Sequence, residues 1–326
     1  MSVIIIFLQK AIAQGMGMLY GALGEIVTEK SGNLNLGVPG VMYMGGIAGL
    51  MGAFFYENGN PAPNGLVGLI ISFLCAFLAG IIGGLIYSIL TITLRANQNV
   101  TGLALTTFGT GFGNFFSGSL SALAGGVGQI SVASTGAAYT KSIPVLSQIP
   151  VIGPVLFSYG FMTYLCIILA CVLAFFLAKT RKGLNLRAVG ENPATADAAG
   201  INVTLYKYLA TCIGCGISGL GGLYFVMEYS GGTWTNNGFG DRGWLAVALV
   251  IFSLWKPLNA IWGSILFGGL YILYLYLPGV GRSAQEIFKM LPYLVTIIVL
   301  IFTSFRRKRE NQPPAGLGQP YFREER

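Results

Sequence analysis

The chain alternates between long apolar runs and short segments that carry its turn-forming and charged residues. A run of about twenty apolar residues is long enough to cross the hydrocarbon core of a bilayer as a helix. One apolar run, residues 244–255, is too short for a simple crossing helix, so the number of membrane elements is eight, nine or ten, with nine favoured. The pattern therefore predicts an all-α, polytopic membrane protein with about nine transmembrane helices. The predicted spans are residues 5–24, 34–56, 66–94, 100–118, 157–178, 208–229, 244–255, 260–277 and 287–305.

Charged residues predict the orientation of these spans. Clustered Lys and Arg beside an apolar span mark the cytoplasmic side of a membrane. When the nine spans alternate, the clustered basic residues all fall on one side and a mixed group of charges falls on the other, which places the N-terminus outside and the C-terminus in the cytoplasm. The inner group is Arg95, residues 179–187, Lys256 and residues 306–309; the outer group is Glu57, Lys141, Asp241 and Arg282.

Composition agrees with a membrane protein and argues against an enzyme. Hydrophobic residues make up 54% of the chain and charged residues only 9%, against about 25% charged in soluble domains. There is no His, which removes the commonest general base and metal ligand. The chain also lacks a phosphate-binding Gly-x-x-x-x-Gly-Lys-Ser/Thr motif, so any ATP must be bound by another subunit. We therefore expect no catalytic residues, no metal and no cofactor, and we interpret Cys212 and Cys215 as small buried residues.

One polar stretch, residues 179–202, carries both a basic cluster and helix-capping residues. Asn192 is suited to cap a helix N-terminus, Pro193 to occupy the first helical position and Gly200 to follow the C-terminus. These residues predict a helix of under two turns over residues 193–199. A helix this short is not stable alone in water and needs a partner surface. An ordinary polar connection between two spans is the alternative, but the capping favours a docking element.

Four stretches resemble permease subunits of bacterial ABC importers for nucleosides and simple sugars. They are GEIVTEKSGNLNLGVPGVMYMGG at 24–46, NQNVTGLALTTFGTG at 97–111, the loop at 180–203 and GDRGWLAVALVIFSLWKPLNAIWGSILFGGL at 240–270. They follow one another along nearly the whole chain, have no simple compositional cause, and are most similar to the nucleoside branch.

The resemblance implies a function and a set of partners. The central loop of such permeases carries a coupling helix that fits a cleft in a separate ATPase subunit. A second permease subunit, homologous but different, would complete the pore, and an extracytoplasmic substrate-binding lipoprotein would deliver solute at the bacterial plasma membrane. On this resemblance the ATPase-coupling residues are Gly190, Glu191, Asn192, Pro193, Ala196, Asp197, Ala199 and Gly200.

An internal repeat divides the chain. Residues 1–118 and 207–305 show the same order of features around a linking span at 157–178, including a Gly-Gly-Leu motif at 83–85 and at 268–270. Because a single span separates the halves, they would be inverted repeats, which point to a transport path, although Gly-rich sequence can also repeat by chance. The predicted parts are a transmembrane permease domain (1–305) with a coupling loop (179–206), and a cytoplasmic tail (306–326) whose polar composition predicts disorder. The Ser- and Gly-rich stretch 119–154 predicts an outer loop with short helices, or a plain surface loop.

The polar residues predicted at membrane depth are uncharged. An interruption at Gly37, Pro39 and Gly40 would expose backbone groups, which is tolerated only where they meet protein or a water-filled cavity. Neutral amides and hydroxyls suit an uncharged polar solute. For any one residue, hydrogen bonding between helices is the alternative. The candidate solute-path residues are Asn33, Asn35, Pro39, Asn99, Thr106, Thr107 and Asn114.

A self-contained secondary transporter built from inverted repeats is the second hypothesis. Such proteins place an ionisable residue inside the membrane. With the first span ending at residue 24, the predicted span interiors lack one, apart from Lys10 and Glu228. We interpret Asp241 and Arg242 as an interfacial ion pair. On sequence alone the pore is either a homodimer or a heterodimer, and the solute either a nucleoside or a ribose-like sugar.

Overall fold

The computed structural model describes residues 3–123, 130–142, 152–277, 279, 281–306 and 311–322. These residues form helices joined by loops, with one isolated antiparallel bridge between Ser131 and Thr233. The elements, in chain order, are α1 (Val3–Glu29), α2 (Val38–Asn58), α3 (Gly65–Ser88), η1 (Ile89–Thr93), α4 (Gln98–Leu123), α5 (Ala133–Tyr139), α6 (Ile152–Leu156), α7 (Phe161–Lys179), α8 (Arg181–Glu191), α9 (Pro193–Ala198), α10 (Val203–Tyr224), η3 (Phe225–Tyr229), α11 (Arg242–Phe252), α12 (Pro257–Ile272), η4 (Leu273–Tyr276) and α13 (Arg282–Arg306).

A helix occupies each of the nine predicted segments, but not every one crosses a membrane by length and composition. Among the described residues, seven helical segments are long and apolar enough: α1, α2, α3 with η1, α7, α10 with η3, α12 with η4, and α13. Helix α4 is long enough at 26 residues but rich in Gly, Thr and Ser, and α11 has only 11 residues. The all-helical membrane fold is confirmed, whereas nine crossings remain a prediction.

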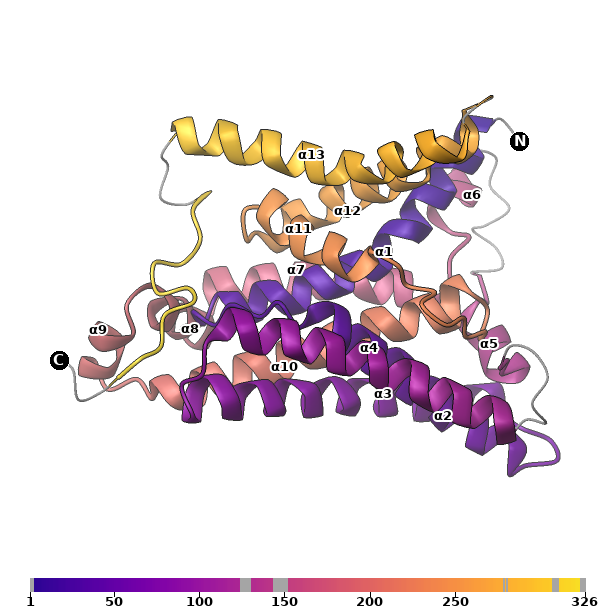
Figure 1. Cartoon of the computed structure of the whole chain (residues 1–326), viewed down its shortest axis with the longest axis horizontal. Helices are drawn as coiled ribbons and strands as arrows, with labels where there is room; N and C mark the ends of the chain where they lie inside the picture. Colours follow the sequence, from indigo (N-terminus) through magenta and orange to yellow (C-terminus); the bar gives the residue numbers. More distant parts are fainter. Residues whose placement is uncertain are drawn as a thin grey trace.

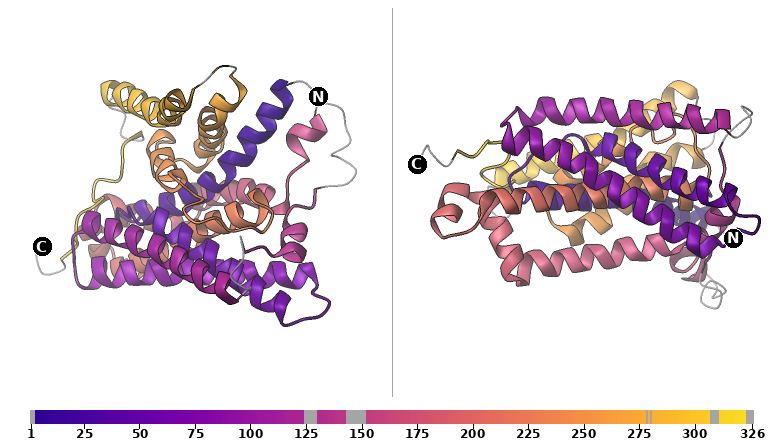
Figure 2. Two further views of the ribbon diagram at one scale, coloured as in Figure 1. Left: turned by 45° about the vertical axis from the view of Figure 1, so that its right-hand side comes forward. Right: turned by 90° about the horizontal axis from the view of Figure 1, so that it is seen from below.

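The long helices run between two ends of the molecule (Figure 1). One end holds α8, α9 and the described end of the chain, and the other holds α5, α6 and the N-terminal end of α1; two further views show the same separation (Figure 2). Arg95 lines a cavity beside Asp197 at the first end, and Lys256 donates to Asn311 there (2.9 Å). We call this the basic end. At the opposite end, the Glu57 carboxylate accepts a hydrogen bond from the Thr135 amide (2.6 Å).

Helices α1 and α10 cross through direct backbone contact. A Cβ on Gly24 would lie 2.2 Å from the Gly214 carbonyl oxygen, and a Cβ on Gly214 would lie 2.4 Å from the Gly24 carbonyl oxygen. Any side chain at either position would therefore force the helices apart. Small residues at such crossings are typical of membrane helix packing, since apolar lipid gives little reason for apolar helices to associate.

The structure corrects the interpretation of Asp241 and Arg242 as an ion pair. No salt bridge joins them in the described part of the chain. Instead the Arg242 guanidinium lies 5.0 Å from the Phe225 ring centre and 5.2 Å from that of Tyr229, and it donates to the Gly238 carbonyl (2.7 Å). A guanidinium stacks readily on aromatic faces, and adjacency in sequence gives no hint of these partners.

The stretch 119–154 contains short helices, as predicted: the end of α4, then α5 and α6. Its residues 124–129 and 143–151 lie outside the described residues, as do residues 307–309 of the basic group.

Candidate functional site

Helices α8 and α9 meet at Asn192 at the basic end, and we call residues 181–198 the bracket. Asn192 ends α8, where its amide donates to the Ala188 carbonyl (2.9 Å). Its side-chain oxygen also accepts a hydrogen bond from the Thr195 amide (3.0 Å), which caps the N-terminus of α9. Pro193 occupies the first position of α9. The local sequence therefore stops one helix and starts the next at a single residue.

The C-terminus of α9 is closed by backbone hydrogen bonds around a left-handed glycine. Gly200 has φ +83°, a conformation that side chains with a Cβ rarely adopt. The Ile201 amide donates to the Ala196 carbonyl (3.0 Å) and the Gly200 amide to the Asp197 carbonyl (2.9 Å). This pair of bonds is the Schellman motif, which satisfies helix carbonyls that otherwise lack donors. Both caps predicted for α9 are present in the structure.

The two faces of α9 have different surroundings. Ala196 is 3% exposed and packs in a small apolar cluster with Val189 and Val203. Ala194 and Ala198 are exposed on the opposite face. Helix α9 is therefore anchored on one side and presents small side chains on the other.

Gly190 joins α8 to the turn that follows α1. A Cβ on Gly190 would lie 2.3 Å from the Lys30 carbonyl oxygen, so only glycine permits this approach. Burial lowers the pKa of the Lys30 ammonium, and the nearby Glu191 carboxylate opposes that effect. Helix α8 of the bracket is thus in direct backbone contact with the segment between α1 and α2.

The tail segment, residues 311–322, covers the basic end, and the prediction that it is disordered is wrong for these residues. The Gly316 amide donates to the Gly190 carbonyl (2.9 Å), and the Gly318 amide to the Gly32 carbonyl (3.1 Å). The Tyr321 hydroxyl donates to the Asp197 carboxylate (2.8 Å). Because these bonds use backbone groups and a single side chain, the polar composition of the tail could not reveal them.

The segment between α1 and α2 is held by buried carboxylates that the sequence analysis missed. Glu25 and Glu29, 1% and 3% exposed, lie in the last turns of α1, which continues past the predicted boundary at residue 24. The Glu25 carboxylate accepts a hydrogen bond from the Asn35 backbone amide (3.0 Å), and the Glu29 carboxylate accepts one from the Trp255 indole N–H. The predicted first span ends at residue 24, so both carboxylates fell outside the predicted spans, and the structure adds them to the end of α1.

Asn33 and Asn35 are both buried against α10. The Asn33 side-chain amide donates to the Thr211 hydroxyl (2.9 Å), and the Asn35 side-chain amide donates to the Cys215 sulfur (3.3 Å). Both residues therefore join the interrupted segment to α10, as in the alternative interpretation of interhelical hydrogen bonding.

The remaining path candidates are spread along α2 and α4. Pro39 is buried near the start of α11, where a Cβ on Gly243 would approach it to 2.6 Å. The Thr106 hydroxyl donates to the Leu36 carbonyl (2.7 Å), and the Asn114 side-chain amide donates to the Asn237 side-chain oxygen, far from the basic end (2.9 Å). Asn99 and Thr107 are exposed on α4. The structure does not bring these residues together in one described cavity.

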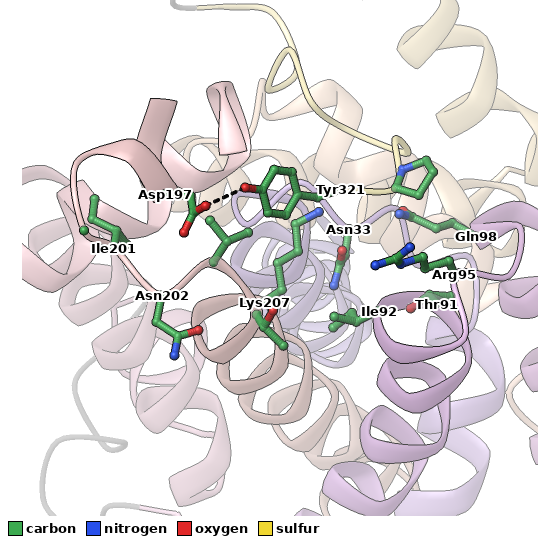
Figure 3. Close-up of a pocket in the computed structure, with 14 residues that line it drawn as sticks. Asn33, Thr91, Ile92, Arg95, Gln98, Asp197, Ile201, Asn202, Lys207 and Tyr321 are labelled. Carbon is green, nitrogen blue, oxygen red and sulfur yellow. Dashed lines mark hydrogen bonds between the residues drawn. The ribbon is translucent and has the colours of Figure 1, made fainter. Parts of the chain in front are cut away.

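A cavity of about 360 Å³ lies at the basic end, between α10, the turn before α4, Asn33 and the tail segment (Figure 3). We call it the basic-end cavity. Lys207 and Arg95 extend into it, and Gln98 lines it while its side-chain oxygen accepts from the Leu34 amide (2.7 Å). Tyr321 lies over it from the tail segment. Lys207 is not among the predicted site residues, although a Lys one turn into an apolar helix is a usable signal.

Comparison with known proteins decides the family. The model of the family described as "Branched-chain amino acid transport system / permease component" matches residues 7–300. The chain belongs to this permease family. The guanosine ABC transporter permease NupQ of Bacillus subtilis is 32% identical over 315 residues, covering 95% of this chain and 94% of its own length. The nucleoside ABC transporter permease NupC of Lactococcus lactis is 31% identical over 290 residues, or 87% of each chain.

A third relative is named for another solute. A Haloferax volcanii protein with a provisional glucose ABC transporter permease name, TsgC13, is 30% identical over 331 residues and 94% of each chain. The chain is thus a permease subunit of an ABC importer, a multi-pass plasma-membrane protein and not an enzyme. Such a permease works with an ATPase and is expected to carry no cofactor of its own. Family membership favours this function over the secondary transporter.

Proposed function

We propose that this permease imports nucleosides, with the basic end in the cytoplasm and α9 as the helix on which the ATPase subunit docks. The observation that carries the proposal is the double-capped α9, anchored through Ala196 and exposing Ala194 and Ala198. A short rigid helix with small outward side chains fits a cleft in a partner. Relatives named for nucleoside and guanosine transport support that solute over a simple sugar.

The coupling residues would then have distinct roles. Asn192, Pro193, Ala199 and Gly200 set the length and ends of α9. Ala196 anchors it, while Gly190 passes its movement to the turn after α1. Glu191 and Asp197 join it to the tail segment, since Glu191 accepts from the Ala315 amide (3.3 Å) and Asp197 from Tyr321 (2.8 Å).

The switch of solute access would pass from α9 to the interrupted segment before α2. That segment is attached to α8 through Gly190, to α10 through Asn33 and to α4 through the Leu36 carbonyl. A shift of α9 would therefore move three elements at once. We propose that the solute path follows α2 and α4, from Asn114 near the outer end to Asn33 and Asn35 at the basic end. Thr106 and Pro39 would lie between these points.

The division into two inverted repeats is part of the same proposal. Helix α1 packs on α12 and α10 packs on α3, so the first helix of each half meets the third helix of the other. The Gly-Gly-Leu motifs follow this exchange: a Cβ on Gly268 would lie 2.2 Å from the Ala11 carbonyl oxygen of α1, and one on Gly84 would lie 2.9 Å from the Thr211 carbonyl oxygen of α10. Residues 1–118 and 207–305 would tilt against each other around the linking span 157–178.

The partners follow from the same scheme. An ATPase subunit would bind α9, a lipoprotein would deliver solute at the outer end, and a second, homologous but different permease would complete the pore. Asn99 and Thr107, exposed on α4, would then lie where the two permeases meet.

The docking role is tested by adding bulk to the exposed face of α9. We expect Ala198→Trp to abolish both co-purification of the ATPase subunit and nucleoside uptake, because the indole would prevent α9 from entering the cleft. Ala137→Trp is the matched control, an exposed helical alanine on α5 at the outer end. It should leave ATPase binding unchanged. Full ATPase binding and uptake by the Ala198→Trp transporter would contradict the proposal.

A further inference from the structure

Two basic side chains enter the basic-end cavity from different elements. Lys207 projects from α10, and Arg95 points toward it from the turn that follows η1, with Asn33 between them (Figure 3). The cavity is also lined by Asn202 and Thr204 at the N-terminus of α10, where the helix dipole favours an anion, although the Asn202 side-chain oxygen already caps the Leu205 amide (3.0 Å). The chemistry of the cavity is therefore mainly that of an anion site.

Lys207 is the strongest sign that the cavity takes a ligand. It is 4% exposed, and no carboxylate among the described residues lies within salt-bridge distance of its ammonium. An unpaired buried charge is costly, so buried ammonium groups are normally matched by an anion. Asp197 is the carboxylate that lines the cavity, and it accepts a hydrogen bond from the Tyr321 hydroxyl at the cavity edge. Two cations thus face the cavity against one engaged carboxylate.

Asn33 adds a second, different requirement. Its side-chain nitrogen is fixed by the Thr211 hydroxyl (2.9 Å), and its side-chain oxygen is buried with no hydrogen-bond partner. A buried acceptor without a donor is unfavourable. A ligand that satisfies both Lys207 and Asn33 must therefore carry an anionic group and, beside it, a hydroxyl donor.

We propose that the basic-end cavity binds a phosphorylated sugar, free or as part of a nucleoside monophosphate, with the phosphate between Lys207 and Arg95 and a hydroxyl on Asn33. A phosphate carries between one and two negative charges near neutral pH and accepts several charge-assisted hydrogen bonds, which matches two cations. The volume of about 360 Å³ falls within the range of small-molecule sites. Tyr321 covers the bound ligand from the tail segment.

The position of the site gives it a consequence for transport, and this part rests on the proposed function. The tail segment that covers the cavity also holds α9 through Asp197. A bound ligand would fix Tyr321, the tail and α9 in one arrangement and so slow the movement that drives uptake. The phosphorylated form of an imported nucleoside, made by a kinase-type phosphoryl transfer in the cytoplasm, would therefore act as a brake on further import.

Binding is tested on the purified full-length permease in lipid nanodiscs, without ATPase or uptake, so the result does not depend on the proposed function. Ribose 5-phosphate carries both required groups, inorganic phosphate lacks the hydroxyl-bearing sugar, and ribose lacks the phosphate. We expect ribose 5-phosphate to raise the unfolding temperature saturably, as a ligand of the folded state does. Inorganic phosphate should bind several-fold more weakly, and ribose should give no shift at the same ionic strength.

Variants locate the site. Lys207→Met should weaken ribose 5-phosphate binding by about tenfold or more, the effect of one charge-assisted hydrogen bond. Its unfolding temperature without ligand should not fall, because the change removes an unpaired buried charge. Lys182→Met, an exposed lysine of α8, is the matched control and should bind as the unmodified protein does. The proposal is overturned if ribose 5-phosphate gives no saturable shift, if inorganic phosphate binds equally tightly, or if both variants weaken binding alike.

Discussion

Glu25 and Glu29 lie one helical turn apart in α1 and are buried at the basic end. Each accepts a hydrogen bond from a different part of the chain: Glu25 from the Asn35 amide and Glu29 from the Trp255 indole. Trp255 and the preceding Leu254 have φ near +55°, so the turn between α11 and α12 needs external support. The two carboxylates therefore support two irregular segments, the one between α1 and α2 and the turn between α11 and α12.

Replacing Glu29 should separate its hydrogen bond from its charge. Glu29→Gln keeps an acceptor for Trp255 and should leave the unfolding temperature close to that of the unmodified protein. Glu29→Leu leaves the indole N–H buried without an acceptor and should destabilise the fold by about 1–3 kcal/mol. Thermal unfolding in nanodiscs measures both variants. Equal loss of stability in the two would mean that the negative charge matters, and that the bond to Trp255 does not.

At the residue scale, features set by neighbours in sequence could be predicted, whereas contacts between residues far apart in sequence could not. Asn192, Pro193 and Gly200 were assigned to the ends of a short helix because capping depends on neighbours within a few residues. Helix α1 continues past residue 24 to Glu29, because its packing against α10 and α12 buries the last turns, and apolar run length does not report such distant contacts.

At the scale of elements, the positions of the long helices could be predicted from the length of the apolar runs, whereas the ordered tail segment could not. It has no apolar period, and its contacts pair backbone groups with Gly190 and Gly32, far away in the sequence. It also contributes Phe322, whose ring centre lies 4.4 Å from the Arg95 guanidinium. The tail thus joins α9, the turn after α1 and the turn before α4. An element of this kind restricts the relative movement of the parts that it joins.

Removal of the tail should loosen α9. Deletion of residues 311–326 is expected to increase hydrogen exchange across α9, because the bonds to Gly190, Glu191 and Asp197 are lost. It should also raise the number of ATP molecules hydrolysed per solute imported. Deletion of residues 323–326 alone is the matched control, since it keeps every tail contact described above. Unchanged exchange in α9 after the longer deletion would show that the tail does not support this helix.

At the scale of the whole molecule, α4 stands apart from the other long helices. Its buried face, which includes Gly109, packs closely on α2: a Cβ on Gly109 would lie 2.3 Å from the Gly40 carbonyl oxygen. Its opposite face carries Thr107, Gly111 and Gly118 beside the exposed Val100 and Leu103, and nothing lies within 4 Å of a Cβ built on either glycine. Lipid gains little from contact with small or polar side chains, whereas another helix can approach such a face closely. The sequence marked α4 as polar, but only the structure separates its two faces.

The open face of α4 is where we expect the second permease to pack. A photo-crosslinking amino acid placed at Gly111 should link the chain to a membrane subunit of similar size, because closely packed helices bring backbone within reach of the probe. The same amino acid at Leu266, 44% exposed on α12, should react with lipid instead. Mass spectrometry of the product identifies the partner, and a peptide from this same chain would replace the heterodimer with a homodimer. Absence of any protein adduct at Gly111, with efficient lipid labelling there, would place α4 on the lipid-facing surface and remove Asn99 and Thr107 from the pore.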